Sequence, residues 1–165
     1  MRIDSIEMSD LEILNGKGAI KLTWTGQNVN NLNLIRNVRF RDYTECAIAN
    51  DANDMPYWRI TDCVFWGANT SSTIGMALSG LTDSSIIDRC SFVNNRIAIK
   101  MRKGGNNAHI DRCDFLFYTG PLGPYPEEDP YHPRSYIWLV PTPTKTNSGA
   151  GFVVNECRIG NENKV

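Results

Sequence analysis

A six-residue pattern of apolar and polar positions recurs along this chain. The first position is apolar, the second and third are polar or charged, the fourth is Cys or aliphatic, and the sixth is Phe or Ile. We call each occurrence a repeat and the residues at one position a column. The repeats are MSDLEI at 8–13, IRNVRF at 35–40, ITDCVF at 60–65, IDRCSF at 87–92, IDRCDF at 110–115 and VNECRI at 154–159.

The repeats are regularly spaced. Their fourth positions are Leu11, Val38, Cys63, Cys90, Cys113 and Cys157, which lie 27, 25, 27, 23 and 44 residues apart. Four intervals are one period of 23 to 27 residues, and the last is about one period plus an insertion. A fixed period of this length is typical of stacked repeat architectures.

Each period predicts short strands joined by tight turns. The fourth and sixth positions share one face of a strand, whereas the first position breaks the alternation and predicts a bend. A second apolar strand follows in most periods: AIKL at 19–22, CAIA at 46–49, GMAL at 75–78 and IAIK at 97–100. We therefore expect an all-β solenoid, a parallel β-helix of about six coils. Leucine-rich repeats would need more Leu, and a β-sandwich would show hairpin turns without a fixed long period.

Stacking explains the cysteines. Parallel strands lie about 4.8 Å apart, so the residues of one column stack into a ladder, and we expect the fourth-position ladder to face inward. Cysteine then acts as a small buried hydrophobe and the Phe rings stack beside it, so a catalytic thiol is not expected. Five cysteines without a CxxC pair also argue against a disulfide framework and a structural zinc site. The predicted thiol ladder comprises Cys63, Cys90, Cys113 and Cys157.

Composition narrows the picture. The 165 residues are 41% hydrophobic with a formal net charge of −1, which suits one domain over 1–165 with one core. Near-neutral charge argues against nucleic acid as a partner, and no apolar run is long enough for membrane insertion. No signal-peptide pattern begins the chain, and we expect no metal or cofactor. Because six coils without capping helices leave open strand edges, we expect a segment of a larger chain.

The segments ITDCVFWGANTSSTIGMALSG, IDRCSFVNNRIAIK and IDRCDF resemble the pectin-lyase-like right-handed parallel β-helix superfamily. The resemblance covers the chain apart from about 30 residues of insertion. The superfamily includes pectate lyases, polygalacturonases, epimerases and trimeric bacteriophage tailspikes. The Gly-His-Gly and Asp-Asp motifs of polygalacturonases are absent, and no pectate lyase site matches. The resemblance therefore favours a tailspike-like protein: a homotrimer in a virion or at a cell surface, with polysaccharide and other virion proteins as partners.

The insertion is the predicted functional segment. Residues 118–148 hold seven of the eight prolines, which excludes helix and central strand and predicts a long loop on the side of the solenoid. Aromatic rings beside carboxylates suit sugar binding, and two carboxylates suit glycoside cleavage. The alternative is that its Tyr and Pro residues pack on their own coil or on a neighbouring subunit. The predicted substrate-binding residues are Tyr125, Tyr131, Arg134, Tyr136, Trp138 and Trp66, with Trp58 extending the platform; the predicted catalytic residues are Asp114, Glu127, Glu128 and Asp129.

Polar columns offer a second set of candidates. Asp88 and Asp111 fall one coil apart and could hold a cation or raise a pKa. Opposite charges lie beside them, because Asp62 and Arg89, and Arg112 and Glu156, are neighbours in the third-position column. The simpler expectation is therefore an outer ladder of side chains whose charges neutralise one another. The fifth-position column is expected to point outward and comprises Glu12, Arg39, Val64, Ser91, Asp114 and Arg158.

Three functions stay open on these patterns. The first is a tailspike-like β-helix that binds a polysaccharide and, as a depolymerase, cleaves it by hydrolysis or elimination. The second is a structural virion or surface protein that only spaces and trimerises. The third is a bacterial polysaccharide lyase or epimerase.

Overall fold

The computed structural model describes residues 7–22, 33–50, 57–68, 72–78, 84–101, 108–117, 135–139 and 152–161. These residues form fifteen strands and no helix, so the described part of the chain is all-β. It follows that no helix in these ranges is long and apolar enough to cross a membrane. The strands are β1 (Glu7–Leu14), β2 (Gly18–Leu22), β3 (Asn33–Tyr43), β4 (Cys46–Asn50), β5 (Trp58–Thr61), β6 (Val64–Gly67), β7 (Ile74–Leu78), β8 (Ile86–Asp88), β9 (Ser91–Val93), β10 (Ile97–Met101), β11 (Ala108–Asp111), β12 (Asp114–Phe117), β13 (Ser135–Leu139), β14 (Phe152–Asn155) and β15 (Arg158–Asn161).

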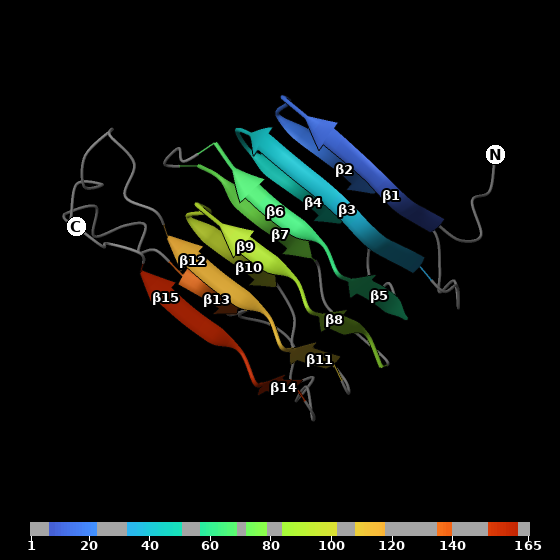
Figure 1. The fold of residues 1–165 in the computed structure, drawn as a ribbon, viewed down its shortest axis with the longest axis vertical. Helices are drawn as coiled ribbons and strands as arrows, with labels where there is room; N and C mark the ends of the chain where they lie inside the picture. The colour runs from blue at the N-terminus through green and yellow to red at the C-terminus, as the bar shows by residue number, and fades with distance from the viewer. Residues whose placement is uncertain are drawn as a thin grey trace, which may run out of the picture.

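All of the strand pairs are parallel, and they build two sheets (Figure 1). The larger sheet has the order β14-β11-β8-β5-β3-β6-β9-β12-β15, with β1 also paired to β3. The long strand β3 joins its two arms, because its first half pairs with β5 and its second half with β6. The smaller sheet has the order β13-β10-β7-β4-β2 and lies behind the larger one in Figure 1. The core lies between the two sheets.

The strand register confirms the columns. First-position residues pair along the larger sheet, as in Ile60 with Ile87 and Ile87 with Ile110. The sixth-position rings stack in the same way, with centroids 4.9 Å, 4.8 Å and 5.3 Å apart along Phe40, Phe65, Phe92 and Phe115. All four rings are buried, and burying one such side chain contributes about 1.5–3 kcal/mol. The recurrence read from the sequence is therefore a register of stacked side chains.

The predicted bend lies at the third position of every repeat. The residues there have φ between 50° and 57°, in the left-handed region: Asp10, Asn37, Asp62, Arg89, Arg112 and Glu156. In the last four repeats this turn separates two strands, whereas Asp10 and Asn37 lie inside the continuous strands β1 and β3. Its backbone N–H donates to the second-position carbonyl of the next repeat, from Asp62 to Asp88 at 3.1 Å and from Arg89 to Asp111 at 3.1 Å. Neighbouring bends are thus tied together through their main chains.

The second strand of each period is also confirmed, as β2, β4, β7 and β10. The interval 118–148 was predicted as a loop, but its residues 135–139 form strand β13, and the rest of the interval lies outside the described residues. Residues 135–139 read SYIWL and hold no proline, although Pro133 and Pro141 flank them. They pair in parallel with β10, so that Ile137 faces Ile99. Proline disfavours a strand at the position that it occupies, so a proline-free segment between two prolines can still pair.

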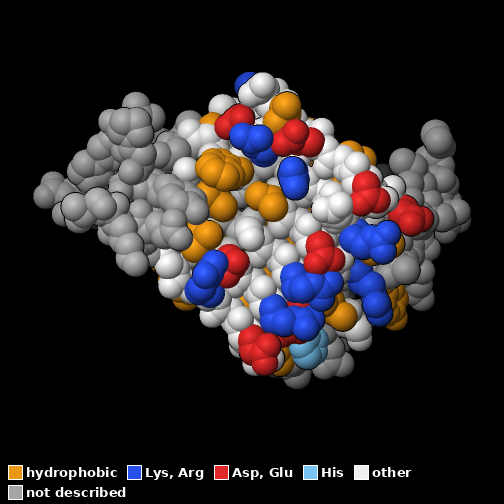
Figure 2. All heavy atoms as spheres, in the orientation of Figure 1, with side chains coloured by type: hydrophobic (Ala, Val, Ile, Leu, Met, Phe, Trp, Pro, Cys, Tyr) orange, Lys and Arg blue, Asp and Glu red, His pale blue; other side chains and the backbone are white. Residues whose placement is uncertain are grey.

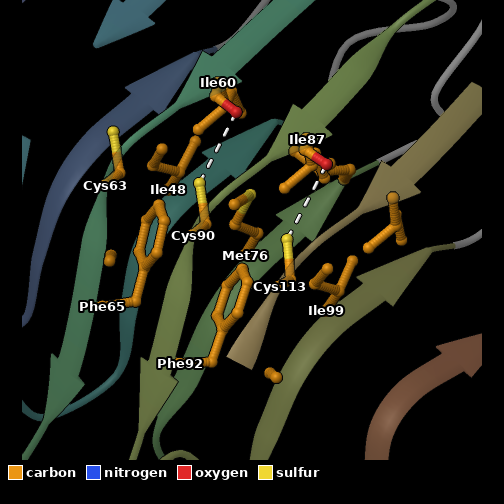
Figure 3. Close-up of a cluster of buried hydrophobic side chains, with 14 of the residues drawn as sticks. Ile48, Ile60, Cys63, Phe65, Met76, Ile87, Cys90, Phe92, Ile99 and Cys113 are labelled. Carbon is orange, nitrogen blue, oxygen red and sulfur yellow. Dashed lines mark hydrogen bonds between the residues drawn. The ribbon is translucent and has the colours of Figure 1, made fainter. Parts of the chain in front are cut away.

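The cysteine column is packed and also hydrogen-bonded (Figure 3). All five cysteines are free thiols, and Cys63, Cys90 and Cys113 are buried. Each column thiol donates to the first-position carbonyl of the preceding repeat, for example from Cys90 to Ile60 at 3.5 Å. The same thiol also reaches the carbonyl of Asp88, two residues before it, at 3.4 Å. The S–H group is a weak donor, and the rest of the cysteine side chain is apolar. Cysteine can therefore donate a hydrogen bond to the carbonyls beside the bend while it packs in the core.

Candidate functional site

The candidate site is the outward surface of strands β6, β9, β12 and β15, which we call the outer face. Residues at the fifth and seventh positions alternate with the buried Phe column, and most of them are at least partly exposed, whereas Val93 between Trp66 and Leu116 is only 4% exposed. Its named members are Val64, Trp66, Ser91, Asp114, Leu116 and Arg158. Hydrophobic side chains gather over these strands, with charged groups to either side (Figure 2). The outer face therefore combines an apolar strip with a polar border.

Trp66 is the large aromatic residue of this face. Its side chain stands opposite Arg41 in the register of β3 and β6, and the Arg41 guanidinium carbon lies 5.8 Å from the ring centroid. Arg41 is held in turn by Glu12, at 3.3 Å between Nη1 and Oε1. A guanidinium over an indole contributes about 0.5–1 kcal/mol at an exposed site. The pair fixes the ring orientation while Trp66 stays 39% exposed.

Asp114 lies on the same face and is ion-paired. Arg158 Nε donates to Asp114 Oδ1 at 2.9 Å across β12 and β15. The register neighbours of Asp114 are Ser91 on one side and Arg158 on the other. Neither is a carboxylate, so the described neighbours supply no second acid for glycoside cleavage. What this pair offers to a ligand is a polar anchor with both hydrogen-bond donors and acceptors.

The remaining predicted site residues fall in three groups. Six lie outside the described residues, namely Tyr125, Glu127, Glu128, Asp129, Tyr131 and Arg134. Tyr136 lies on β13, is half-buried, and sets its ring 5.8 Å from that of Phe115 at an angle of 59°. Trp138 follows on the same strand, opposite Lys100 in register. Among the described candidates, Trp66 and Asp114 share the outer face, whereas Tyr136 packs against the core.

The proposed role of Trp58 in a sugar platform is wrong. Trp58 is completely buried and belongs to the core. It stands two residues before Ile60, so the alternation of a strand places both on the inward face. Asn33 in the preceding repeat and Ala108 in a later one occupy equivalent positions and are buried as well.

The polar columns form a neutralised network at the bends, as expected. Arg89 donates from Nε and Nη2 to the two carboxylate oxygens of Asp62, at 2.6 Å and 2.9 Å, and this contact lowers the pKa of Asp62. Arg89 also contacts Asp88, which accepts two bonds of 2.8 Å from Arg112. Arg112 therefore pairs with Asp88 rather than with Glu156. Within the described ranges no group of three or more His, Cys, Asp or Glu residues is arranged to hold a metal ion.

Arg41 is the site residue that motif analysis missed. It stands one position after the Phe column, outside the six-residue pattern, in the repeat that precedes Trp66. The sequence does contain a signal for this contact, because Arg41 and Trp66 occupy the same position, one residue after the Phe column, in consecutive repeats. Stacking places equal positions side by side, so a cation beside an aromatic residue follows from the period alone.

The chain was compared with models of known protein families, with curated proteins and with solved structures. None of the three comparisons finds a match.

Proposed function

We propose that this chain is part of a right-handed parallel β-helix of the tailspike-like kind, and that its outer face binds an extended polysaccharide. The fixed period, the parallel pairing of equal positions and the bend at the third position of each repeat support the β-helix. The proposal includes a homotrimer in a virion or at a cell surface. It does not depend on a metal or a cofactor.

The observation that carries the glycan-binding proposal is the exposed indole of Trp66 on the same face as the Asp114–Arg158 pair. An indole stacks on the apolar face of a pyranose, and a carboxylate and a guanidinium bond to hydroxyl groups. Trp66 lies on β6 and Asp114 on β12, two strand steps apart across the sheet and two residues apart along it, or about 12 Å. One glycan chain lying across the strands would contact both.

Binding is favoured over cleavage on this face. Hydrolysis needs two carboxylates flanking the scissile bond, one as acid and one as base or nucleophile. Asp114 is engaged by Arg158, and its register neighbours are not acids. A depolymerase activity would need Asp114 to work with Glu127, Glu128 or Asp129, and loss of cleavage in each single Gln or Asn variant would test that version.

The test is direct binding to a panel of bacterial capsular polysaccharides and lipopolysaccharides, followed by calorimetric titration of any positive glycan. We expect Trp66→Ala to weaken binding about tenfold or more, as for an aromatic residue central to an interface. Asp114→Asn should weaken it less, because Arg158 remains. Tyr57→Ala is the matched control, since Tyr57 is 40% exposed and does not belong to the outer face.

Two outcomes would reject the proposal. The panel may yield no ligand while the protein stays folded, which would favour the structural virion or surface protein. Alternatively, Trp66→Ala may bind a positive glycan as tightly as the unmodified chain, which would place binding elsewhere.

A further inference from the structure

The charged side chains beside Trp66 leave one arginine without an acid. Glu12 lies opposite Arg39 in the register of β1 and β3, yet its carboxylate contacts Arg41, at 3.3 Å. Asp42, three residues after Arg39 on β3, is exposed and forms no ion pair with it. Among the residues that the structure describes, Arg39 has no ion pair and no side-chain hydrogen bond. Its charge is available to a ligand.

Arg39 lies at the border of the outer face, one strand step from Trp66. Its side chain is exposed between the buried Val38 and Phe40, so it points outward. In the register of β3 and β6 it stands opposite the half-buried Val64, and Trp66 follows two residues later. The Cα atoms of Arg39 and Trp66 are therefore about 8 Å apart, a distance that the long arginine side chain can span. Figure 2 shows Lys and Arg side chains beside the hydrophobic patch over these strands.

The other arginines around the outer face are already engaged by acids. Arg158 Nε donates to Asp114 Oδ1 at 2.9 Å, so this pair carries no net charge. Arg41 is held by Glu12 and lies over the indole of Trp66. Arg39 thus differs from both, because no acid of the described part of the chain lies within ion-pair distance of its guanidinium.

A free guanidinium near an indole suits a sugar that carries a carboxylate. The indole stacks on the apolar face of the pyranose, and the planar fork of an arginine binds a carboxylate through two parallel hydrogen bonds. A carboxylate on the sugar over Trp66 would extend across Val64 toward Arg39. A neutral sugar offers the guanidinium only hydroxyl oxygens, whose hydrogen bonds are weaker than those of a carboxylate.

We infer that the outer face selects an acidic polysaccharide, and that Arg39 binds the carboxylate of the sugar stacked on Trp66. The inference rests on the proposed glycan binding, and it adds the class of glycan and the residue that discriminates it. Trp66 then recognises the sugar ring and Arg39 its charge. The Asp114–Arg158 pair binds hydroxyl groups further along the same chain.

The test uses a panel of acidic bacterial capsular polysaccharides, each paired with its carboxyl-reduced form, in which the carboxylates have become primary alcohols. Calorimetric titration measures the dissociation constant of each form for the unmodified chain and for Arg39→Gln. Arg59→Gln is the matched control, because Arg59 is exposed, has no ion pair among the described residues and lies on β5, in the other arm of the larger sheet. Circular dichroism checks that both variants are folded.

The unmodified chain should bind the acidic form about fivefold or more tightly than the reduced form, as for one charge-assisted contact. Arg39→Gln should weaken binding of the acidic form by the same factor and leave the reduced form unchanged, because both changes remove the same contact. Trp66→Ala should weaken binding of both forms, and Arg59→Gln should change neither.

Three outcomes would overturn the inference. Equal affinity for the two forms, with Trp66→Ala weakening both, would reject the acidic ligand and leave the proposed glycan binding intact. Equal weakening of the acidic form by Arg39→Gln and Arg59→Gln would show that overall charge, rather than Arg39, selects the polymer. If the folded chain binds no polymer of either form, the inference and the proposed function fail together.

Discussion

The guanidinium of Arg112 holds the carboxylate of Asp88 with two hydrogen bonds, each 2.8 Å long, across one step of the stack. Such bidentate, charge-assisted pairs are among the stronger hydrogen bonds in proteins. Only 8% of the Asp88 side chain is exposed, and Arg89 contacts it as well. Asp88 is therefore the buried centre of the network that joins the bends.

Replacing Asp88 tests this network. Asp88→Asn sets an amide group against two guanidinium donors and removes the charge, so the free energy of unfolding should fall by about 2 kcal/mol. Asp111→Asn is the matched control, because Asp111 follows in the same column, is more exposed, and among the described residues has an ion-pair contact only with His109, at 3.9 Å. It should change stability by less than about 0.5 kcal/mol. Equal losses in urea denaturation of the two variants would contradict the assignment.

The same bends predict an acid-sensitive stability. A hydrogen bond from Asn37 lowers the pKa of Asp10, and the Arg89 contact lowers the pKa of Asp62, from an ordinary value of 3.8 in each case. A carboxyl group with a lower pKa when folded stabilises the fold above its unfolded value and loses that contribution as the pH falls through its folded value. The free energy of unfolding should therefore hold steady from about pH 7 to about pH 5 and fall below about pH 4.

Asp62→Asn should make that acid-side decline shallower, since one of the two shifted groups is gone. Denaturant titrations at a series of pH values measure both the decline and its slope. A loss of stability that is complete above pH 5, or a slope unchanged by Asp62→Asn, would show that these carboxyl groups do not control it.

The thiols should differ in reactivity. The thiolate is the nucleophile, and burial raises the pKa of Cys90 well above its ordinary range. Cys63, Cys90 and Cys113 should resist alkylation in the native protein, whereas the half-buried Cys46 and Cys157 should react first. Mass spectrometry after timed alkylation gives the order. Native Cys90 modified as fast as in denatured protein would exclude a packed column.

Side chains of the Phe column should contribute more to the free energy of unfolding in its middle than at its end. Phe92 is buried between two stacked rings, so Phe92→Ala should cost about 3–5 kcal/mol. Ile159 occupies the same column at the exposed end, so Ile159→Ala should cost less than about 0.5 kcal/mol in a dilute sample. Thermal or urea unfolding measures both. Similar costs would mean that the end of the column is as well packed as its middle.

Much of the fold was predictable because strand alternation and the period act together. A one-residue slip would move Phe92 from the inward to the outward face, so spacing alone set the register. The left-handed bend was less visible. Asp and Asn adopt positive φ readily and signal it at Asp10 and Asn37, but Arg and Glu do so rarely, and Arg112 is held there by its position in the stack.

The candidate site was predictable only in part. Trp66 and Asp114 follow from the outward columns, but Trp58 was misplaced because the alternation was not extended backward from Ile60. Tyr136 was assigned to a loop because prolines surround it, although pairing with β10 makes its segment a strand. Pairing between segments distant in the sequence decides both the burial of Tyr136 and the contact of Arg41 with Trp66.

The most direct test of the account is a titration of the ¹⁵N-labelled protein with a glycan that it binds, observed at the indole N–H resonances. The Trp66→Phe and Trp58→Phe variants assign the two signals. The Trp66 signal should shift progressively and saturate with the binding curve, while that of the buried Trp58 stays unchanged. A saturating titration that leaves the Trp66 signal in place would contradict glycan binding at the outer face.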